Sequence, residues 1–312
     1  MTPAGAVSPA ESVATTATFG ERLEDAFDRF GRLCVGIDPH SWLLTDWGLP
    51  DSAAGAEDFG RRVVEAAAGR VGIVKPQVAF YERFGSAGYA ALERVLADAR
   101  AAGLLVIADV KRGDLGTSVE AYGQAWLSPG SPLEVDAITV NPYMGVGSLA
   151  STIALAAEYQ KGLFLLAATS NPEAADLQQA VLARGTQAGH SVAASVLAQV
   201  REINETAHVV DTPTDVAGPT TGFGSVGVVL GATVSLGDFG IDISAPAAAV
   251  VTPVLAPGFG HQGANPTDLT SLFGGYAQGV IVSESRSVLS AGPDQVADEI
   301  TRRVTEAGAT RG

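Results

Sequence analysis

Charged residues and cysteines are scarce in this chain of 312 residues, and no apolar run in it is long. Only 17% of the residues are charged whereas 46% are hydrophobic, so the chain is able to bury a large core. The single cysteine, Cys34, excludes an intrachain disulfide, and its apolar surroundings at residues 33–37 predict a buried thiol. The apolar runs have the length of strands, so we expect no membrane-spanning helix. These features favour a soluble cytoplasmic protein.

Positive charge is also in short supply. The 19 lysines and arginines face 34 aspartates and glutamates, which gives a formal net charge of −15 and makes nucleic acid or an acidic membrane a poor partner. The four histidines are scattered without the spacing of metal ligands, so we expect no metal site. Residues 1–18 lack the basic start and apolar segment of a signal peptide, and we predict a disordered tail there.

Short β-rich runs alternate with longer Ala-rich amphipathic stretches along the rest of the chain. This alternation is typical of βα units that form a parallel sheet. The expected strands cover residues 33–38, 72–80, 104–111, 137–143, 163–170, 226–233, 250–257 and 279–285. Since eight parallel strands close a barrel, we predict an α/β (β/α)8 TIM barrel that forms a single domain over residues 19–312.

Helical spacing of apolar residues predicts the helices between these strands. An extra N-terminal helix at residues 19–30 is expected to cover the bottom of the barrel, and residues 207–225 are interpreted as a long loop. The alternative is a doubly wound sheet, but no G-x-G-x-x-G fingerprint follows the first strand. The other expected helices cover residues 56–69, 88–102, 148–159, 187–206 and 294–307.

Polar side chains recur at the ends of the predicted strands or just beyond them. In a parallel barrel these ends converge at one mouth, where such folds place their active sites. Any one of these residues taken alone is more often a cap or a solvated loop residue, so their convergence carries the prediction. They are Asp38, Lys75, Asp109, Lys111, Asn141, Ser170 and Arg286.

The segment around the third strand end is the most informative. Asp109 and Lys111 are two residues apart, so alternation along a strand predicts that their side chains share one face. An exposed salt bridge is the simpler interpretation, but the preceding run is apolar and burying charges is costly, which favours a functional pair. Asp114 lies beyond the strand, where it is able to point across this mouth or toward a neighbouring subunit.

A second group of residues would suit a phosphate. The glycines Gly258, Gly260 and Gly263 follow the seventh strand, and Arg286 follows the eighth. The loops after these two strands are the usual phosphate-binding corner of a TIM barrel. Glycines let backbone N–H groups approach phosphate oxygens, and a guanidinium supplies a planar fork of donors.

At these residues the sequence resembles the orotidine 5′-phosphate decarboxylase family, in its longer bacterial branch. The resemblance covers essentially the whole chain after residue 18, in barrel order, with Ser118 where the family usually has Thr. The motif is Asp109-x-Lys111-x-x-Asp114-Leu115-Gly116, with support from Gly36-Ile37-Asp38, Val74-Lys75-Pro76, Thr169-Ser170-Asn171-Pro172, Pro257-Gly258-x-Gly260-x-Gln262-Gly263 and Ser285-Arg286-Ser287. The likeness to the longer bacterial branch is carried by Lys75-Pro76-Gln77-x-Ala79-Phe80-Tyr81-Glu82.

The resemblance implies conversion of orotidine 5′-monophosphate (OMP) to uridine 5′-monophosphate (UMP) and CO2, without metal or organic cofactor. It implies that Lys111 donates the proton to C6 of the ring and that Asp109 orients it beside the departing carboxylate. Asp114, Leu115 and Ser118 would complete the site, and a homodimer with shared sites is expected. By the same resemblance, Asp38 and Lys75 would hold the ribose, Ser170 the pyrimidine edge, and Gln262 with Arg286 the phosphate.

Two other functions fit parts of this pattern. A Mg2+-dependent hexulose-phosphate synthase of the same superfamily also carries an Asp-x-Lys-x-x-Asp strand end. A non-catalytic nucleotide-binding barrel would use the phosphate corner, but phosphate and ribose binding alone does not need an Asp–Lys–Asp array.

Overall fold

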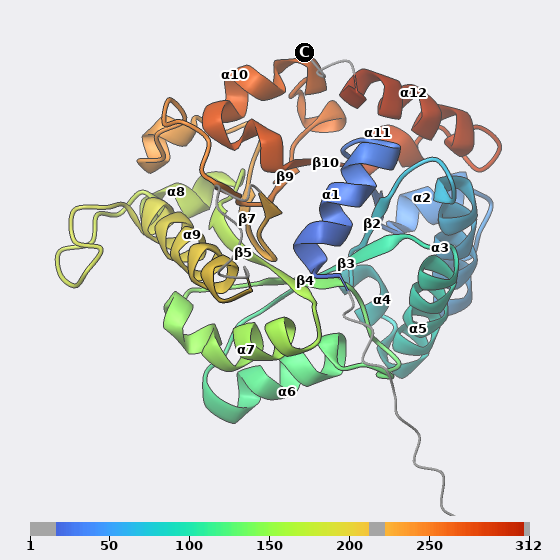
Figure 1. Ribbon diagram of the computed structural model, residues 1–312. Coiled ribbons are helices and arrows are strands. Elements are labelled where there is room, and N and C mark those ends of the chain that lie inside the picture. Colours follow the sequence, from blue (N-terminus) through green and yellow to red (C-terminus); the bar gives the residue numbers. More distant parts are fainter. Residues whose placement is uncertain (1–16, 212–221, 309–312) are drawn as a thin grey trace, which may run out of the picture.

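The computed structural model describes residues 17–211 and 222–308, and a closed barrel of parallel strands forms its centre (Figure 1). The barrel strands follow one another in chain order around the wall, and β1 pairs with β10 to close it. A two-stranded parallel pair, β6 with β8, lies outside the barrel. The strands are β1 Leu33–Ile37, β2 Ile73–Pro76, β3 Leu105–Arg112, β4 Ala137–Val140, β5 Gly162–Ala168, β6 Gly222–Phe223, β7 Val226–Leu230, β8 Val250–Val251, β9 Val254–Pro257 and β10 Val280–Glu284.

Helices surround the barrel, as Figure 1 shows, and the (β/α)8 fold predicted from the sequence is confirmed. No helix of the described residues is both long and apolar enough to cross a membrane. The α-helices are α1 Phe19–Phe30, α2 Ser41–Asp46, α3 Ala53–Ala67, α4 Ala79–Glu82, α5 Gly85–Ala101, α6 Gly116–Leu127, α7 Ala150–Glu158, α8 Ala175–Gln178, α9 Val192–Asp211, α10 Leu269–Phe273, α11 Arg286–Leu289 and α12 Val296–Gly308.

Short 3-10 helices occupy several of the connections. They are η1 Val146–Leu149, η2 Pro172–Ala174, η3 Leu236–Phe239, η4 Gly260–Gln262, η5 Pro266–Asp268 and η6 Gly274–Gly279.

Helix α1 covers the amino-terminal end of the barrel, as the sequence predicted. Its apolar face buries Phe19, Leu23 and Phe27 against the lowest inward-pointing residues of the strands, and the Phe19 ring meets Phe164 edge to face. A capping box starts the helix: the Thr18 hydroxyl accepts from the backbone N–H of Glu21, and the Glu21 carboxylate accepts from the N–H of Thr18. The predicted tail included Thr18, which instead caps α1, and residues 1–16 of that tail lie outside the described part of the chain.

Cys34 lies in the same closed end and is fully buried, as predicted. Burial raises the pKa of its thiol to about 12, because an apolar surrounding disfavours the thiolate. The cysteine is therefore held as an unreactive core residue.

Three sequence expectations need correction. The second strand ends at Pro76, and residues 79–82 form α4 instead of continuing the strand. The run at 250–257 is split between β8 and β9, because Thr252 and Pro253 interrupt it and β8 turns away to pair with β6. The predicted loop at 207–225 is helical up to Asp211, in α9, and paired at 222–223, whereas residues 212–221 lie outside the described ranges.

Six of the described α-helices were missing from the prediction, namely α2, α4, α6, α8, α10 and α11. Helix α6 carries a mixed face of Gly, Thr, Tyr and Gln that obscures its periodicity, and α2 is too short to show one. The other predicted helices are confirmed with end shifts of a few residues, the largest at α9, which begins at Val192 instead of residue 187.

Candidate active site

A cavity of about 900 Å³ opens at the carboxyl ends of the barrel strands. The strand ends and the loops that follow them form its wall, so residues far apart in the chain meet there. Most of the residues singled out from the sequence line it, namely Asp38, Lys75, Asp109, Lys111, Asn141, Ser170, Gly258, Gln262 and Arg286.

The charged floor of the cavity lies one layer above the apolar bottom of the barrel. Inward-pointing residues alternate along a strand, so two positions beyond the buried Ile73 and Ile107 come Lys75 and Asp109. On β4 the same step leads to Thr139. The strand register therefore brings these three polar side chains together.

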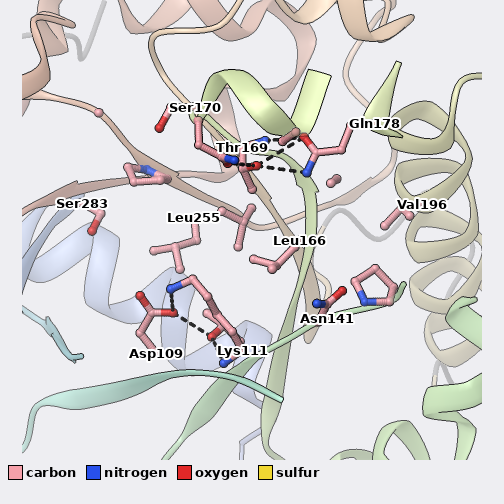
Figure 2. Close-up of a pocket in the computed structure, with 18 of the residues that line it drawn as sticks. Asp109, Lys111, Asn141, Leu166, Thr169, Ser170, Gln178, Val196, Leu255 and Ser283 are labelled. Atoms are coloured by element: carbon pink, nitrogen blue, oxygen red, sulfur yellow. Dashed lines mark hydrogen bonds and ion pairs between the residues drawn. The ribbon is translucent and has the colours of Figure 1, made fainter. Parts of the chain in front are cut away.

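Asp109 is the centre of this group. Its Oδ1 accepts from Lys111 Nζ at 2.6 Å and from the Thr139 hydroxyl at 2.8 Å. Its Oδ2 accepts from Lys75 Nζ at 3.1 Å and from Gln77 Nε2 at 3.0 Å. Figure 2 shows Asp109 and Lys111 side by side in the cavity. Four donors thus fix both carboxylate oxygens.

The charges of this group stabilise one another. Burial would raise the pKa of Asp109, but Lys75 and Lys111 hold it well below its usual range. Burial would likewise lower the pKa of Lys75, yet the carboxylates of Asp109 and Asp38 raise it above the ordinary value. Asp109 is therefore an anion and Lys75 a cation at neutral pH, although both are more than nine-tenths buried.

The backbone at Lys111 is unusual. Lys111 has φ +47°, in the left-handed region that residues with a side chain seldom occupy, and the pairing of β3 with β4 shifts register between Ala108 and Arg112. Its N–H donates to the Thr139 hydroxyl at 3.0 Å. The predicted meeting of Asp109 and Lys111 is confirmed, but it occurs where the strand is irregular and not through the simple alternation of a regular strand.

Five predicted site residues do not line the cavity of their own chain, and three of these lie around the start of α6. Asp114 is half-buried in the loop after β3 and accepts from the backbone N–H of Leu115 at 2.8 Å. Leu115 is 61% exposed, and Ser118 is exposed in the first turn of α6. None of the three lines the cavity that holds Lys111.

The predicted phosphate corner is built from glycines in left-handed conformations. Gly258, Gly260 and Gly263 have φ of +117°, +66° and +103°. Of the three, only Gly258 lines the cavity, together with Gln262 from η4. Arg286 faces the same space at the start of α11, and among the described residues its guanidinium makes no ion pair or side-chain hydrogen bond. The Arg286 guanidinium is therefore able to bind an anion next to this loop.

Two further polar groups of the cavity wall have an atom that makes no hydrogen bond within the described residues. Within the described ranges, Asp38 Oδ1 and Ser285 Oγ are buried without a hydrogen bond. Ser170 lies on the far side of the cavity from Asp109, next to Thr169, whose N–H donates to the amide oxygen of Gln178 (Figure 2). Buried polar atoms without partners are rare, which is consistent with a ligand that supplies them.

Two contacts of Asp109 were not singled out from the sequence as functional. Gln77 belongs to the Lys75-Pro76-Gln77 motif, but the sequence assigned it no role. Thr139 appears in the sequence only as a polar residue in an apolar strand. The only available signal was the alternation of inward-pointing residues along the fourth strand, which could have indicated Thr139, because the alignment of Gln77 with Asp109 depends on strand register. Leu166, Val229 and Leu255 were also missed, and they give the wall an apolar part.

No group of three or more His, Cys, Asp or Glu side chains in residues 17–211 and 222–308 is placed to hold a metal ion.

Comparisons with known proteins agree on one family. Residues 31–300 match the model of the orotidine 5′-phosphate decarboxylase / HUMPS family. The chain is 48% identical to orotidine 5′-phosphate decarboxylase of Salinispora arenicola over 280 aligned residues. The aligned region covers 90% of this chain and 92% of the relative. It is also 48% identical over 279 residues to the decarboxylase of Streptomyces coelicolor, with 89% and 92% covered.

Solved structures give the same result. A crystal structure from Streptomyces avermitilis, assigned as an orotidine 5′-phosphate decarboxylase, superposes with a TM-score of 0.81 at 44% identity, over 95% of this chain and 96% of that one. The OMP decarboxylase of Leishmania donovani has a TM-score of 0.67 at 28% identity, over 92% and 98% of the two chains.

Proposed function

The chain belongs to the orotidine 5′-phosphate decarboxylase / HUMPS family, and from that premise we propose the roles of its own residues in converting OMP to UMP and CO2. It is a carboxy-lyase of pyrimidine biosynthesis, as its relatives named decarboxylases indicate. The observation that carries the proposed roles is the 2.6 Å contact between Lys111 Nζ and Asp109 Oδ1 in the cavity, with Arg286 available at another part of its wall.

Lys111 is the proton donor in this proposal. When the bond between C6 and the carboxylate carbon breaks, its electron pair stays on C6 and CO2 departs. The Lys111 ammonium stabilises the developing negative charge and transfers a proton to C6, which yields UMP. The neutral amine then regains a proton from water. Asp109 fixes the ammonium through Oδ1 and lies beside the departing carboxylate.

The remaining wall residues bind the parts of the substrate that do not react. Asp38 and Lys75 hold the ribose hydroxyls, for which the unpartnered Oδ1 of Asp38 offers an acceptor. Ser170 binds the pyrimidine edge, and Gln262 with Arg286 binds the phosphate. Because the phosphate is remote from C6, its binding energy is available to position the ring and to close the loop at residues 258–263.

A homodimer completes the site in this proposal. Asp114, Leu115 and Ser118 do not line the cavity of their own chain, which suits residues that serve a neighbouring subunit. Large apolar side chains are exposed on the loops after β3 and β4 and on α6, a pattern that favours a surface covered by another subunit. These are Leu115, Tyr122, Tyr143 and Met144.

Turnover is tested by the loss of the ultraviolet absorbance of OMP when the purified protein is added. We expect decarboxylation that is unchanged by a chelator. Loss of activity on chelation would favour the Mg2+-dependent synthase chemistry of the same family, and binding of UMP without any turnover would favour a non-catalytic barrel.

The shared site is tested by mixing two inactive variants, Lys111→Ala and Asp114→Ala, which are unfolded together and refolded. With random pairing, half of the dimers are mixed and half of their sites are intact, so about a quarter of wild-type activity should return in a two-fold dimer. If mixed dimers form and no activity returns, Asp114 acts within its own chain.

We also propose a cytoplasmic location, which the single buried cysteine supports because it needs no oxidising compartment. Fractionation of the host cell tests this, and recovery of the protein outside the cytoplasm would contradict it.

A further inference from the structure

Glu284 is a buried carboxylate directly behind the phosphate corner. It is the last residue of β10, it is 1% exposed, and it does not line the cavity. Inward-pointing Ile281 and Ser283 alternate with it, so its side chain points outward from the barrel, toward α12. Burying a carboxylate is costly, and burial raises the pKa of this carboxyl.

This carboxylate contacts both loops of the phosphate corner. Its Oε2 accepts from the Ser287 hydroxyl at 2.6 Å, and Ser287 follows Arg286 in the first turn of α11. The same oxygen lies 2.6 Å from the position that a Cβ on Gly260 would take, so the η4 turn rests against it. Gly260 has a left-handed φ as well, and both observations favour glycine there.

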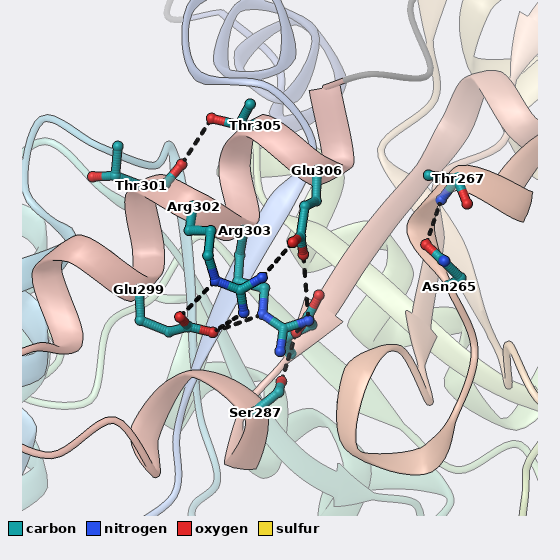
Figure 3. Close-up of polar contacts among 10 residues, drawn as sticks. Asn265, Thr267, Ser287, Glu299, Thr301, Arg302, Arg303, Thr305 and Glu306 are labelled. Carbon is teal, nitrogen blue, oxygen red and sulfur yellow. Dashed lines mark hydrogen bonds and ion pairs between the residues drawn. The ribbon is translucent and has the colours of Figure 1, made fainter.

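Helix α12 holds the carboxylate from the other side. Arg303 Nη1 lies 3.3 Å from Glu284 Oε2, and Arg303 is itself paired with Glu299 at 2.9 Å. Figure 3 shows Glu299, Arg303 and Glu306 gathered with Ser287 at this place. Among the described residues, Glu284 Oε1 has no hydrogen-bond partner, so the contacts through Oε2 determine where the group sits.

We propose that Glu284 is a positioning residue for phosphate recognition. Arg303 anchors its carboxylate, which fixes the positions of the Gly260 turn and the Ser287 turn relative to each other. Gln262 and Arg286, which belong to these two turns, are thereby placed to bind the same phosphate. It acts through these neighbours and does not touch the substrate. The inference rests on the proposed function in one respect, namely that this corner binds the phosphate of a nucleotide.

The test compares substrates with and without the phosphate. Glu284→Ala should lower kcat/KM for OMP by about tenfold to a hundredfold, since a small displacement of a binding group has effects of this size, and should change kcat/KM for orotidine by less than about twofold. Glu284→Gln keeps an acceptor for Ser287 and fills the space beside Gly260, so it should recover most of the OMP activity. Equal losses for both substrates, or no loss for either, would overturn the proposal.

Two variants of α12 separate positioning from stability. Arg303→Gln removes the cationic partner of Glu284 and should give a selective loss for OMP of about threefold, which keeps the proposal testable if Glu284→Ala does not fold. Arg302→Gln is the matched control, because Arg302 pairs with Glu299 and Glu306 on the exposed side and does not contact Glu284. It should leave the ratio between the substrates unchanged, and a selective loss there equal to that of Arg303→Gln would overturn the proposal.

Binding measurements distinguish a failure of this inference from a failure of the proposed function. If the wild-type protein did not decarboxylate OMP, the proposed function would fail, and calorimetry with UMP and uridine would still test the positioning role. We expect Glu284→Ala to weaken UMP binding by about tenfold and uridine binding by less than about twofold. Equal weakening of both ligands would overturn the inference on its own.

Discussion

The two ends of the barrel use the same strands for different purposes. At the amino-terminal end, α1 closes the barrel with Phe19, Leu23 and Phe27, and the inward-pointing strand residues are apolar. At the carboxyl-terminal end, the next layer up carries Lys75 and Asp109, and the cavity is open. One step of two residues along a strand separates the two environments.

This difference shows how the fold tolerates buried charge. A carboxylate surrounded by two ammonium groups is costly to desolvate, and the apolar layer below it supplies compensating stability without contacting the substrate. Substitutions at the open end should therefore change catalysis more than stability, and substitutions at the closed end should do the reverse.

The largest effect is expected at the open end, from Lys111→Ala. Loss of the proton donor and of its charge should lower kcat by about 10³-fold or more, because general acid catalysis and stabilisation of the developing charge are both removed. UMP affinity should change far less, since the charge stabilised by Lys111 develops only on the way to the transition state. Steady-state kinetics and calorimetry measure the two, and a near-normal kcat would rule out this role for Lys111.

Phe19→Ala tests the closed end. Removing a fully buried aromatic ring that contacts Phe164 should lower the free energy of unfolding by about 3–5 kcal/mol, with kcat unchanged at a temperature where the protein is folded. Denaturant unfolding gives the first quantity. Asp25→Ala, on the exposed face of α1, is the control and should cost less than about 1 kcal/mol. A large drop in kcat for folded Phe19→Ala would show that the two ends are coupled.

Arg286→Ala should have a smaller effect, confined to the phosphate. Two charge-assisted hydrogen bonds would be lost, so kcat/KM for OMP should fall by about a hundredfold. Orotidine lacks the phosphate and should lose little, because a substrate cannot miss a contact that it never makes. The ratio of the two kcat/KM values is the measurement, and equal losses would place Arg286 elsewhere in the mechanism.

The smallest effect is expected for Thr139→Val, at the boundary between the two ends. The variant keeps the shape of the side chain but leaves the Lys111 N–H and one lone pair of Asp109 without the hydroxyl. We expect kcat to fall by about tenfold, as one hydrogen bond to a charged group is lost. Thr139→Ser retains the hydroxyl and should stay close to wild type, so equal losses in both variants would indicate a packing effect.

Much of the fold was predictable because most of each strand is a short apolar run, with polar residues near its carboxyl end in several cases. The extra helix at residues 19–30 was also placed correctly, since its apolar face repeats with helical period. The split between β8 and β9 was not foreseen, because the interruption at Thr252 and Pro253 is only two residues long and the two strands differ chiefly in their pairing partners. Helix α9 was predicted to end earlier, since the residues that follow it are rich in Pro, Thr and Gly.

The site was predictable to the extent that strand ends must converge. Asp38, Lys75, Asp109 and Lys111 were located together on that argument, and the structure places all four at one cavity. The left-handed backbone of Lys111 was not predictable, because no local sequence feature marks it and the hydrogen bond that the Lys111 N–H donates to the Thr139 hydroxyl on the next strand helps to hold it. Contacts between strands depend on register, which one sequence does not specify.

The position of α1 has a consequence for how the chain folds. This helix precedes every barrel strand in the sequence, yet its apolar face packs on inward-pointing residues that extend as far along the chain as Ile281 of β10. Its partners are therefore complete only when the last strand has joined, and contacts of such long range form slowly. Until then Phe19, Leu23 and Phe27 lack their native cover and make the partly folded chain prone to aggregation. The capping box at Thr18 and Glu21 is local and needs none of those strands, so it favours the helical conformation of this segment during that interval.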